Sequence, residues 1–511
     1  MDYSKGLAKI AEVDKLSAQR AKNIRETASD HSTITGTKYY VSNNGNDDND
    51  GLSPETAWAT TQKVNSFTFK DGDGILFERG GLWREVQMTQ NTASVTYSAY
   101  GEGPKPIFSG SPENSADESK WELFYEDNDK KIWKFYREDL LDIGSIIFND
   151  GEKYADKDMP SYIDNTWIVR GTEFDSQTPY DVKTSLNHNL KFVHLADSEL
   201  HSGGTPNVAK ATGPIYLRCD ESNPGKLFNS IEFIGITVPF IIRTHGVTID
   251  NFCIKYSKFG VSGYYQKAIE NLTVKNCQME WIGGNLCGYN FRASKGGIAL
   301  RIGNGVEVYG GCKNYTVENS SFYQIYDAAI SPQYVAGGAD SKESDVITDD
   351  IVFRGNLIEY AVYGFESFLD TIRTGVIAKG NNYTIENNIV RMSGCGFGST
   401  RLDRGFSGGF TTGGHPSCYR NFRICNNIFD RASDQLVIAC EKEPDCLPIF
   451  ENNTYIQGHG NVLITKNCYD ANEPKHKCDE NSEKILAEFF RDTTSKVYMV
   501  PFIPPYEFPY K

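Results

Sequence analysis

The residues that most suggest chemistry are three carboxylates in the middle of the chain: Glu307, Asp327 and Glu366. Glu307 and Glu366 each follow a small residue and an apolar residue, a pattern typical of a strand whose third side chain points outward. Asp327 comes just before a third copy of that pattern. A carboxylic acid that donates a proton and a carboxylate that activates water are the groups that hydrolyse a glycosidic bond.

The copies of this pattern align into one column. If each copy is a strand in a coiled stack, the outward residues are Ser262, Glu307, Ser331, Glu366 and Gly398. Neighbouring strands lie about 4.8 Å apart, so Glu307 and Glu366, two turns apart, are separated by roughly 9 to 10 Å at the backbone. Inverting glycosidases hold acid and base about 6.5–9.5 Å apart, and retaining ones about 5 Å. The spacing favours inversion, and Asp327 could replace either glutamate, so the choice among the three stays open.

Polar and aromatic residues near the column are candidates for holding a sugar. Aromatic rings further along these strands could stack on it. The Gly-rich stretch 399–421 could add charged groups, because loops on a rigid scaffold often carry specificity. The candidate substrate-binding residues are Tyr309, Gln333, Tyr334, Phe368, Asp370, Arg401, Asp403 and His415. Outward carboxylates and aromatics also occur on surfaces that bind nothing, so a solvated role stays open for each of them.

Internal repetition shows which elements must position these residues. An Asn-rich apolar strand, a short turn and a second apolar strand recur from 247 to 465, with copies such as 315–334, 351–368 and 383–400. The runs are rich in Val, Ile, Phe and Tyr and alternate in polarity, which favours strands. Paired asparagines such as Asn387–Asn388 predict a bend, because Asn tolerates the left-handed conformation and stacked Asn side chains can bond along the axis. The sequence predicts an all-β parallel solenoid.

Differences in composition and repeat pattern predict five segments of the chain. Residues 1–36 read as a polar helical segment, and 37–112 as an N-terminal cap with the first turns of the solenoid. Residues 113–231 lack the Asn repeat and predict a small inserted antiparallel β domain. Residues 232–465 form the solenoid core with the candidate groove, and 466–511 a C-terminal cap and tail, since an open solenoid end must be covered.

Two stretches resemble a known superfamily. YYVSNNGNDDNDGLSPETAWATTQKVN (39–65) and DGDGILFERGGLWRE (71–85) are similar to the opening of right-handed parallel β-helix proteins of the pectate-lyase-like superfamily, whose carbohydrate-active members include bacterial proteins. GNGVEVYGGCKNYTVENSSFYQIYDAAI (303–330) is similar to a stretch of bacterial β-helix proteins of glycoside-hydrolase type. The resemblance implies a right-handed helix and a carbohydrate substrate.

Composition and charge limit the classes of binding partner that the sequence predicts. The net charge is −15 without a basic stripe, which argues against nucleic acid. The sequence contains no apolar run long enough to predict a membrane span. No signal peptide is visible, and cytoplasmic and secreted locations both stay open. Twelve scattered cysteines favour buried thiols, and neither a metal site nor a cofactor is expected. The sequence leaves the oligomeric state open.

Three functions fit these observations. A glycoside hydrolase acting on a plant or microbial oligo- or polysaccharide is favoured. A polysaccharide lyase or epimerase is the first alternative; it needs a uronic acid substrate and a neutralising group, which the column does not supply. A non-catalytic glycan-binding β-helix protein is the second, because a fold alone does not define an activity.

Overall fold

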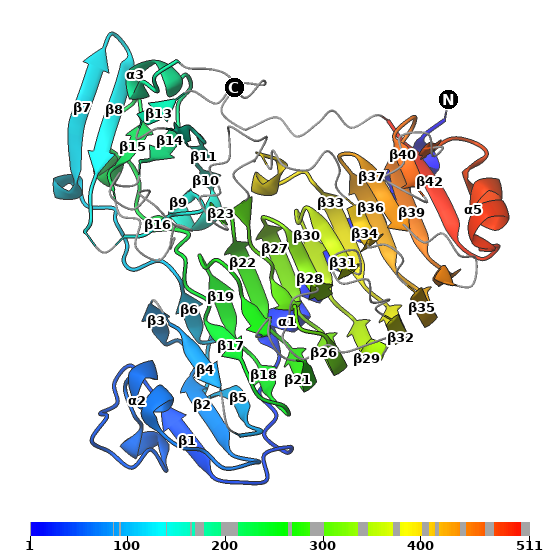
Figure 1. Ribbon diagram of the computed structural model, residues 1–511, viewed down its shortest axis with the longest axis horizontal. Coiled ribbons are helices and arrows are strands. Elements are labelled where there is room, and N and C mark those ends of the chain that lie inside the picture. Colours follow the sequence, from blue (N-terminus) through cyan, green and yellow to red (C-terminus); the bar gives the residue numbers. More distant parts are fainter. Residues whose placement is uncertain are drawn as a thin grey trace.

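A computed structural model shows a right-handed parallel β-helix that carries an inserted β-rich domain near its N-terminal end (Figure 1). Three ten-stranded sheets, A, B and C, run the length of the stack. The structure describes residues 2–501 except for 85, 91–92, 139, 164–165, 169–177, 196–212, 264–267, 287–300, 336–345, 371–378, 401–407, 414–417, 440–445 and 466–474.

Between Gly74 and Thr465, each turn of the helix contributes one strand to each sheet in the order A, B, C; an extra strand begins sheet A, and an antiparallel strand of sheet C precedes the last strand of sheet B. Sheet A consists of β1 (Lys38–Val41), β2 (Gly74–Glu78), β5 (Thr96–Tyr100), β18 (Thr248–Asp250), β21 (Ile269–Lys275), β26 (Cys312–Glu318), β29 (Val346–Arg354), β32 (Lys379–Glu386), β35 (Cys418–Cys425) and β38 (Ile449–Glu451). Sheet B consists of β3 (Leu82–Arg84), β6 (Ile107–Ser109), β19 (Cys253–Lys255), β22 (Gln278–Ile282), β27 (Ser321–Ile325), β30 (Leu357–Glu359), β33 (Ile389–Ser393), β36 (Ile428–Ala432), β39 (Thr454–Gly458) and β42 (Lys496–Val500). Sheet C consists of β4 (Met88–Gln90), β17 (Phe240–Ile242), β20 (Val261–Gly263), β25 (Val306–Val308), β28 (Ala328–Val335), β31 (Tyr363–Asp370), β34 (Gly408–Gly413), β37 (Gln435–Ala439), β40 (Val462–Thr465) and β41 (Lys475–Lys477).

The bend between sheets A and B is built by asparagine pairs, as the sequence predicts. The first Asn of a pair takes the left-handed conformation, with φ of 57° at Asn387. The second is buried and forms a ladder: Asn388 Nδ2 donates to Asn427 Oδ1 at 2.9 Å and to the Phe353 carbonyl at 3.0 Å. Asn356 and Asn453 continue the ladder on either side. The ladder satisfies buried backbone groups at a corner where the strands turn away from one another.

The interior of the stack is one continuous apolar core. Inward residues of matching strands lie above one another, such as Val306, Ile330 and Phe365 on sheet C, each at most 1% exposed. Phe353 of sheet A stacks on Phe365, with ring centroids 5.8 Å apart. The cysteines Cys219, Cys253, Cys277, Cys312, Cys395, Cys425 and Cys478 are buried free thiols.

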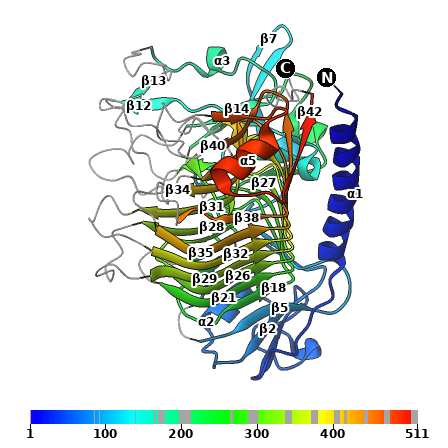
Figure 2. The same cartoon turned by 90° about the vertical axis from the view of Figure 1, so that its right-hand side faces the viewer.

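Helix α1 (Ser4–Glu26) lies along the outside of sheet B, parallel to the axis of the stack (Figure 2). Val13 and Ile24 pack against Leu357, Ile389 and Ile456. Short helices α2 (Thr61–Ser66) and α5 (Ser482–Phe490) lie at the two ends of the stack. Among the described residues, no helix combines the length and the apolar character needed to cross a bilayer.

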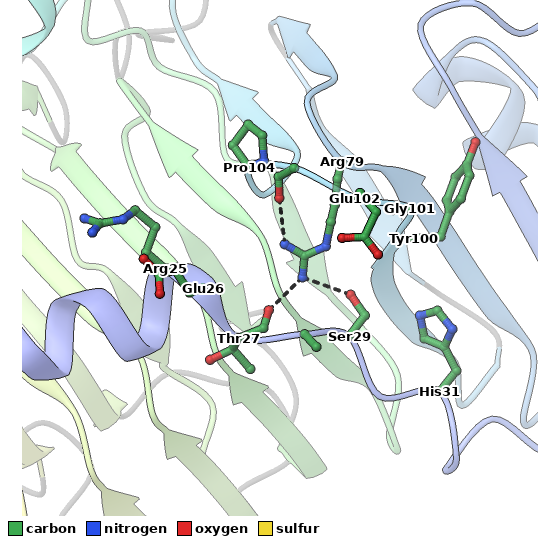
Figure 3. Close-up of a pocket in the computed structure, with 12 residues that line it drawn as sticks. Arg25, Glu26, Thr27, Ser29, His31, Arg79, Tyr100, Gly101, Glu102 and Pro104 are labelled. Atoms are coloured by element: carbon green, nitrogen blue, oxygen red, sulfur yellow. Dashed lines mark hydrogen bonds between the residues drawn. The ribbon is translucent and has the colours of Figure 1, made fainter.

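The segment that follows α1 is tied to the first turns of the stack through Arg79 (Figure 3). Its guanidinium group donates to the Thr27 carbonyl at 2.8 Å, to Ser29 Oγ at 3.1 Å and to the Gly103 carbonyl at 3.2 Å. A cavity of about 520 Å³ lies beside this junction. Because its central cation already serves protein acceptors, we interpret the junction as structural.

The inserted domain has its own small apolar core and packs against one corner of the stack. Its strands are β7 (Trp121–Asp127), β8 (Lys130–Phe135), β9 (Ile146–Phe148), β10 (Lys153–Tyr154), β11 (Asp156–Lys157), β12 (Ser161–Ile163), β13 (Thr166–Ile168), β14 (Lys191–His194), β15 (Ile215–Arg218) and β16 (Ile231–Phe233), with helices α3 (Val182–Ser185) and α4 (Pro224–Leu227). Among the described residues of the insertion, these strands pair antiparallel except for β11 with β14, which is parallel.

The contact between insertion and stack includes an apolar cluster where sheet B leads into sheet C. Ile147 and Tyr154 of the insertion pack there with Trp281 of β22 and with Tyr326 and Phe397, which follow strands of sheet B. A short hairpin, β23 (Asn285–Leu286) with β24 (Arg301–Ile302), extends from the same corner. The insertion therefore lies next to the residues that enter sheet C.

Candidate active site

The two predicted glutamates share one column of sheet C. Glu307 pairs in register with Ser262 of β20 on one side and Ser331 of β28 on the other. Since Ile330 pairs with Phe365, the next residue of β31 in that column is Glu366. The predicted alignment is confirmed at these positions, and two strand spacings separate Glu307 from Glu366 by roughly 10 Å at the backbone.

The predicted place of Gly398 in this column is wrong. Gly398 belongs to a 3₁₀ helix, Phe397–Thr400, and Thr411 of β34 pairs with Glu366 instead. The small–apolar–small pattern at 396–398 suggested a strand. Phe397, however, packs with Trp281 and Tyr326 in the cluster beneath the insertion, so this stretch leaves the sheet.

Glu307 is buried, with 3% of its surface exposed. Its Oε2 accepts from Asn304 Nδ2 at 2.7 Å and its Oε1 from Ser262 Oγ at 3.0 Å. Burial raises the pKa of Glu307 to about 8, and the nearby charge of Asp327 acts in the same direction, while the two hydrogen bonds and Lys258 oppose the rise. Glu307 is therefore mainly protonated at neutral pH, as a proton donor must be.

Asn304 is fixed by its own backbone contacts. Its Oδ1 accepts from the Ala328 N–H at 2.8 Å, and its carbonyl accepts from the Gly260 N–H at 3.2 Å. Through these two oxygen atoms Asn304 contacts the turns before and after its own, where the chain enters sheet C. The Asn304 Nδ2 group is then directed at Glu307.

Glu366 has different surroundings, although it is also buried, with 5% of its surface exposed. Gln333 Nε2 donates to Glu366 Oε2 at 2.9 Å and to Ser331 Oγ at 2.6 Å. Ser331 Oγ in turn donates to the Glu366 carbonyl at 3.0 Å. Like Glu307, which accepts from Asn304, Glu366 therefore accepts a hydrogen bond from a side-chain amide.

Asp327 lies in the turn between β27 and β28 and is 5% exposed. Its backbone N–H donates to the Gly303 carbonyl at 3.2 Å, and its carbonyl accepts from the Tyr363 N–H at 3.1 Å. The effect of its charge on Glu307 places it within electrostatic reach of that acid. The structure thus brings the three predicted carboxylates to one region of sheet C.

The other predicted residues divide into several groups. Gln333 is buried, and its side chain donates a hydrogen bond to the candidate carboxylate of Glu366. Tyr309 is half-buried just beyond the end of β25. Phe368 and Asp370 lie on β31, paired with Gln333 and Val335, but their side chains are outside the described residues.

Tyr334 requires a correction. Its place a few residues beyond the column suggested that it stacks on a sugar, whereas the structure buries its ring in the continuous core with 3% exposure. The reason is parity: Tyr334 lies an even number of residues from inward-facing Ile330, so both point to the same face of the strand. Arg401, Asp403 and His415 lie outside the described residues.

Sequence reasoning missed Asn304, Lys258 and a buried ion pair of the insertion. Lys157 Nζ lies 2.6 Å from Asp142 Oδ1, and both side chains are at most 2% exposed. Asn304 stands three residues before Glu307 between two glycines, a turn signal that was visible in the sequence. Lys258 and the pair gave no such signal, because only the tertiary fold brings them to this corner. Among the described residues, no cluster of three or more His, Cys, Asp or Glu forms a metal-binding group.

Comparison with known proteins gives a short list of similarities. No protein-family model matches the chain. A stretch of 122 residues is 34% identical to lacto-N-biosidase of Bifidobacterium longum subsp. longum, and this match spans 22% of the chain but 7% of that protein.

Solved structures are similar at low sequence identity. GH136 lacto-N-biosidase from Eubacterium ramulus has a TM-score of 0.41 and 11% identity, over 91% of this chain and 68% of that one. XylC in complex with xylose has a TM-score of 0.42 and 11% identity, over 92% and 84%. A family 28 exopolygalacturonase of Yersinia enterocolitica has a TM-score of 0.36 and 11% identity, over 83% and 66%.

Proposed function

We propose that the protein is a glycoside hydrolase in which Glu307 is the general acid and Glu366 the general base, with inversion at the anomeric carbon. The observation that carries this proposal is a pair of buried glutamates in one column of sheet C. Burial raises the pKa of Glu307 to about 8, so it retains a proton to donate. Glu366 accepts a hydrogen bond from an amide, as a water-activating carboxylate can.

The spacing of the column supports inversion. Two strand spacings give roughly 10 Å between backbones, close to the range of about 6.5–9.5 Å between the two carboxyl groups of inverting enzymes and well above the value of about 5 Å for retaining ones. Asp327 then acts on the acid through its charge. The partial identity to a lacto-N-biosidase supports a glycan substrate and makes oligosaccharides with a lacto-N-biose unit the first to test.

The test is a screen for reducing-end release over a panel of neutral and acidic oligosaccharides, followed by two variants on the best substrate. Glu307→Gln and Glu366→Gln should each lower kcat at least about 100-fold, the scale that acid–base catalysis contributes, while substrate binding measured by calorimetry persists. Asp350→Asn, at an exposed carboxylate of β29 on sheet A, is the matched control and should keep activity.

Product analysis separates the alternatives. Nuclear magnetic resonance of the first product should show the anomer opposite to that of the substrate. Retention of configuration would contradict the assigned pair, and an ultraviolet-absorbing unsaturated product would identify a lyase. Binding without any cleavage by the wild type would instead support a glycan-binding protein.

A further inference from the structure

The turn that enters β25 is packed tightly against the turns on both sides of it. A side-chain carbon added at Gly303 would lie 2.6 Å from the Lys258 carbonyl oxygen, and one added at Gly305 would lie 2.5 Å from the Ala329 carbonyl oxygen. The φ of 153° at Gly303 also suits glycine. Asn304, between the two glycines, is buried with 2% exposure and has little freedom to move.

The orientation of the Asn304 amide follows from its partner in the next turn. The Ala328 N–H can only donate, and it lies 2.8 Å from Asn304 Oδ1. An amide turned over would bring Nδ2 against this N–H, so that two donors would face each other. Oδ1 therefore accepts from Ala328, and Nδ2 is the atom that lies 2.7 Å from Glu307 Oε2.

The two carboxyl oxygens of Glu307 then have unequal partners. Asn304 Nδ2 donates and cannot accept, so a proton on Oε2 would again place two donors in contact. Ser262 Oγ lies 3.0 Å from Oε1, and a hydroxyl can accept as well as donate. Of these two partners, only Ser262 can therefore accept a hydrogen bond from protonated Glu307.

We propose that Asn304 is a positioning residue that fixes the proton of Glu307 on Oε1, the oxygen on the side of β20. The inference deepens the proposed function and rests on it for its catalytic meaning. In the acid step the O–H bond at Oε1 breaks, the proton passes to the leaving-group oxygen, and Glu307 is left as a carboxylate. The hydrogen bond from Asn304 to Oε2 strengthens as this negative charge develops, which favours the transfer.

Neutron diffraction on crystals of the deuterated wild-type protein tests the position of the proton without turnover. At a pD below the pKa of Glu307, nuclear density should show deuterium on Oε1, directed at Ser262 Oγ, and two deuterium atoms on Asn304 Nδ2. Deuterium on Oε2, or an Asn304 amide turned over, overturns the inference. Deuterium on neither oxygen of Glu307 overturns the inference together with the assignment of Glu307 as the acid.

The variant Asn304→Asp separates the donor from the structural role of the side chain. An aspartate still accepts from the Ala328 N–H, but it offers Glu307 an acceptor where Asn304 offers a donor. Two carboxyl groups then share one site, so the last proton of the pair should be lost about one pH unit or more above the wild-type midpoint. Difference infrared spectroscopy measures this midpoint, with the carboxylic acid band of Glu307 assigned by its loss in Glu307→Gln.

Asn314→Asp is the matched control, because it makes the same change at an exposed position of β26 and should leave the midpoint unchanged. The other groups that interact with Glu307 through charge, Asp327, Lys258 and Tyr315, are the same in both variants. Thermal melting first verifies folding. If Asn304→Asp does not fold, Asn304→Ala takes its place and should also raise the midpoint, because the ionised form of Glu307 loses a donor.

The outcomes are separate from those of the proposed function. An unchanged midpoint in the folded variant overturns the role of Asn304. In a cleaving enzyme the basic limb of kcat/KM should move to higher pH together with the midpoint, a change that a merely structural role would not produce. If the proton lies on Oε1 and the midpoint moves but no glycan is cleaved, the positioning role stands and the hydrolase proposal fails.

Discussion

At the scale of single residues, the two candidate glutamates are both buried, and each accepts a hydrogen bond from a side-chain amide. Glu307 sits where Asn304, Ser262 and the charge of Asp327 surround a buried carboxyl group. Glu366 receives an amide N–H from Gln333. Their neighbours come from different turns of the stack, so residue type alone could not distinguish the two.

The pH dependence of activity follows from the raised pKa of Glu307. If Glu307 donates a proton, kcat/KM should fall as pH rises through about 8, because the acid is then deprotonated. A pH–rate profile on the cleaved substrate measures this limb. A basic limb near the ordinary pKa of a glutamate would contradict the assignment of Glu307 as the acid.

The same group affects stability. Its folded-state pKa is about 8 against a usual 4.5, so its contribution to stability is fully present below about 4.5 and is lost as pH rises to about 8. Relative to the wild type, Glu307→Gln should therefore gain on the order of a few kcal/mol in free energy of unfolding between those pH values. Urea titrations at low and high pH measure the difference; parallel pH dependences of the two proteins would refute it.

At the scale of elements, the Asn pairs show what sequence could predict. A left-handed Asn at the bend and a stack of Asn side chains along the axis were both inferred from the repeated pair, and the shared column of Glu307 and Glu366 followed from the strand pattern. The prediction of a strand at Gly398 was wrong because Phe397 packs in a separate apolar cluster outside the core of the β-helix. Patterns repeated along the axis were predictable, whereas contacts between distant segments were not.

The ladder gives a prediction with an internal control. Asn388→Gly should cost on the order of 2–3 kcal/mol, because it leaves the Phe353 carbonyl and the Asn356 N–H without their buried partners. Asn387→Gly, one residue earlier, keeps a backbone that allows the left-handed φ of 57° and should change stability far less. Chemical denaturation compares the two, and equal losses would show that the ladder contributes little.

At the scale of the whole molecule, the insertion and the stack meet at a corner that also borders the candidate site. Trp281 and Tyr326 of the stack pack against Ile147 and Tyr154 of the insertion. Asp327 follows Tyr326 directly. The sequence identified an insertion but not the surface that it contacts, because no local signal tells where a domain packs.

Trp281→Ala should therefore disturb both stability and activity. Loss of this buried ring is expected to cost about 3–5 kcal/mol and to reduce kcat, because it loosens the corner beside Asp327. Trp133→Ala, within the insertion and away from that corner, is the comparison and should spare kcat in the folded protein. Similar kinetic losses in both variants would argue against a special role of the corner.

Helix α1 has a mechanical consequence. Repeat proteins ordinarily unravel turn by turn from an end, because each repeat touches only its neighbours. Here Gly6 packs against the Met499 carbonyl of the last strand of sheet B, Arg20 bonds to the Asn356 carbonyl in the middle, and Thr27 bonds to Arg79 near the beginning. Helix α1 thus connects the first, middle and last turns of the stack. A mechanical force applied to one end of the protein should therefore also act on the other end, and mechanical unfolding should occur in a single large step.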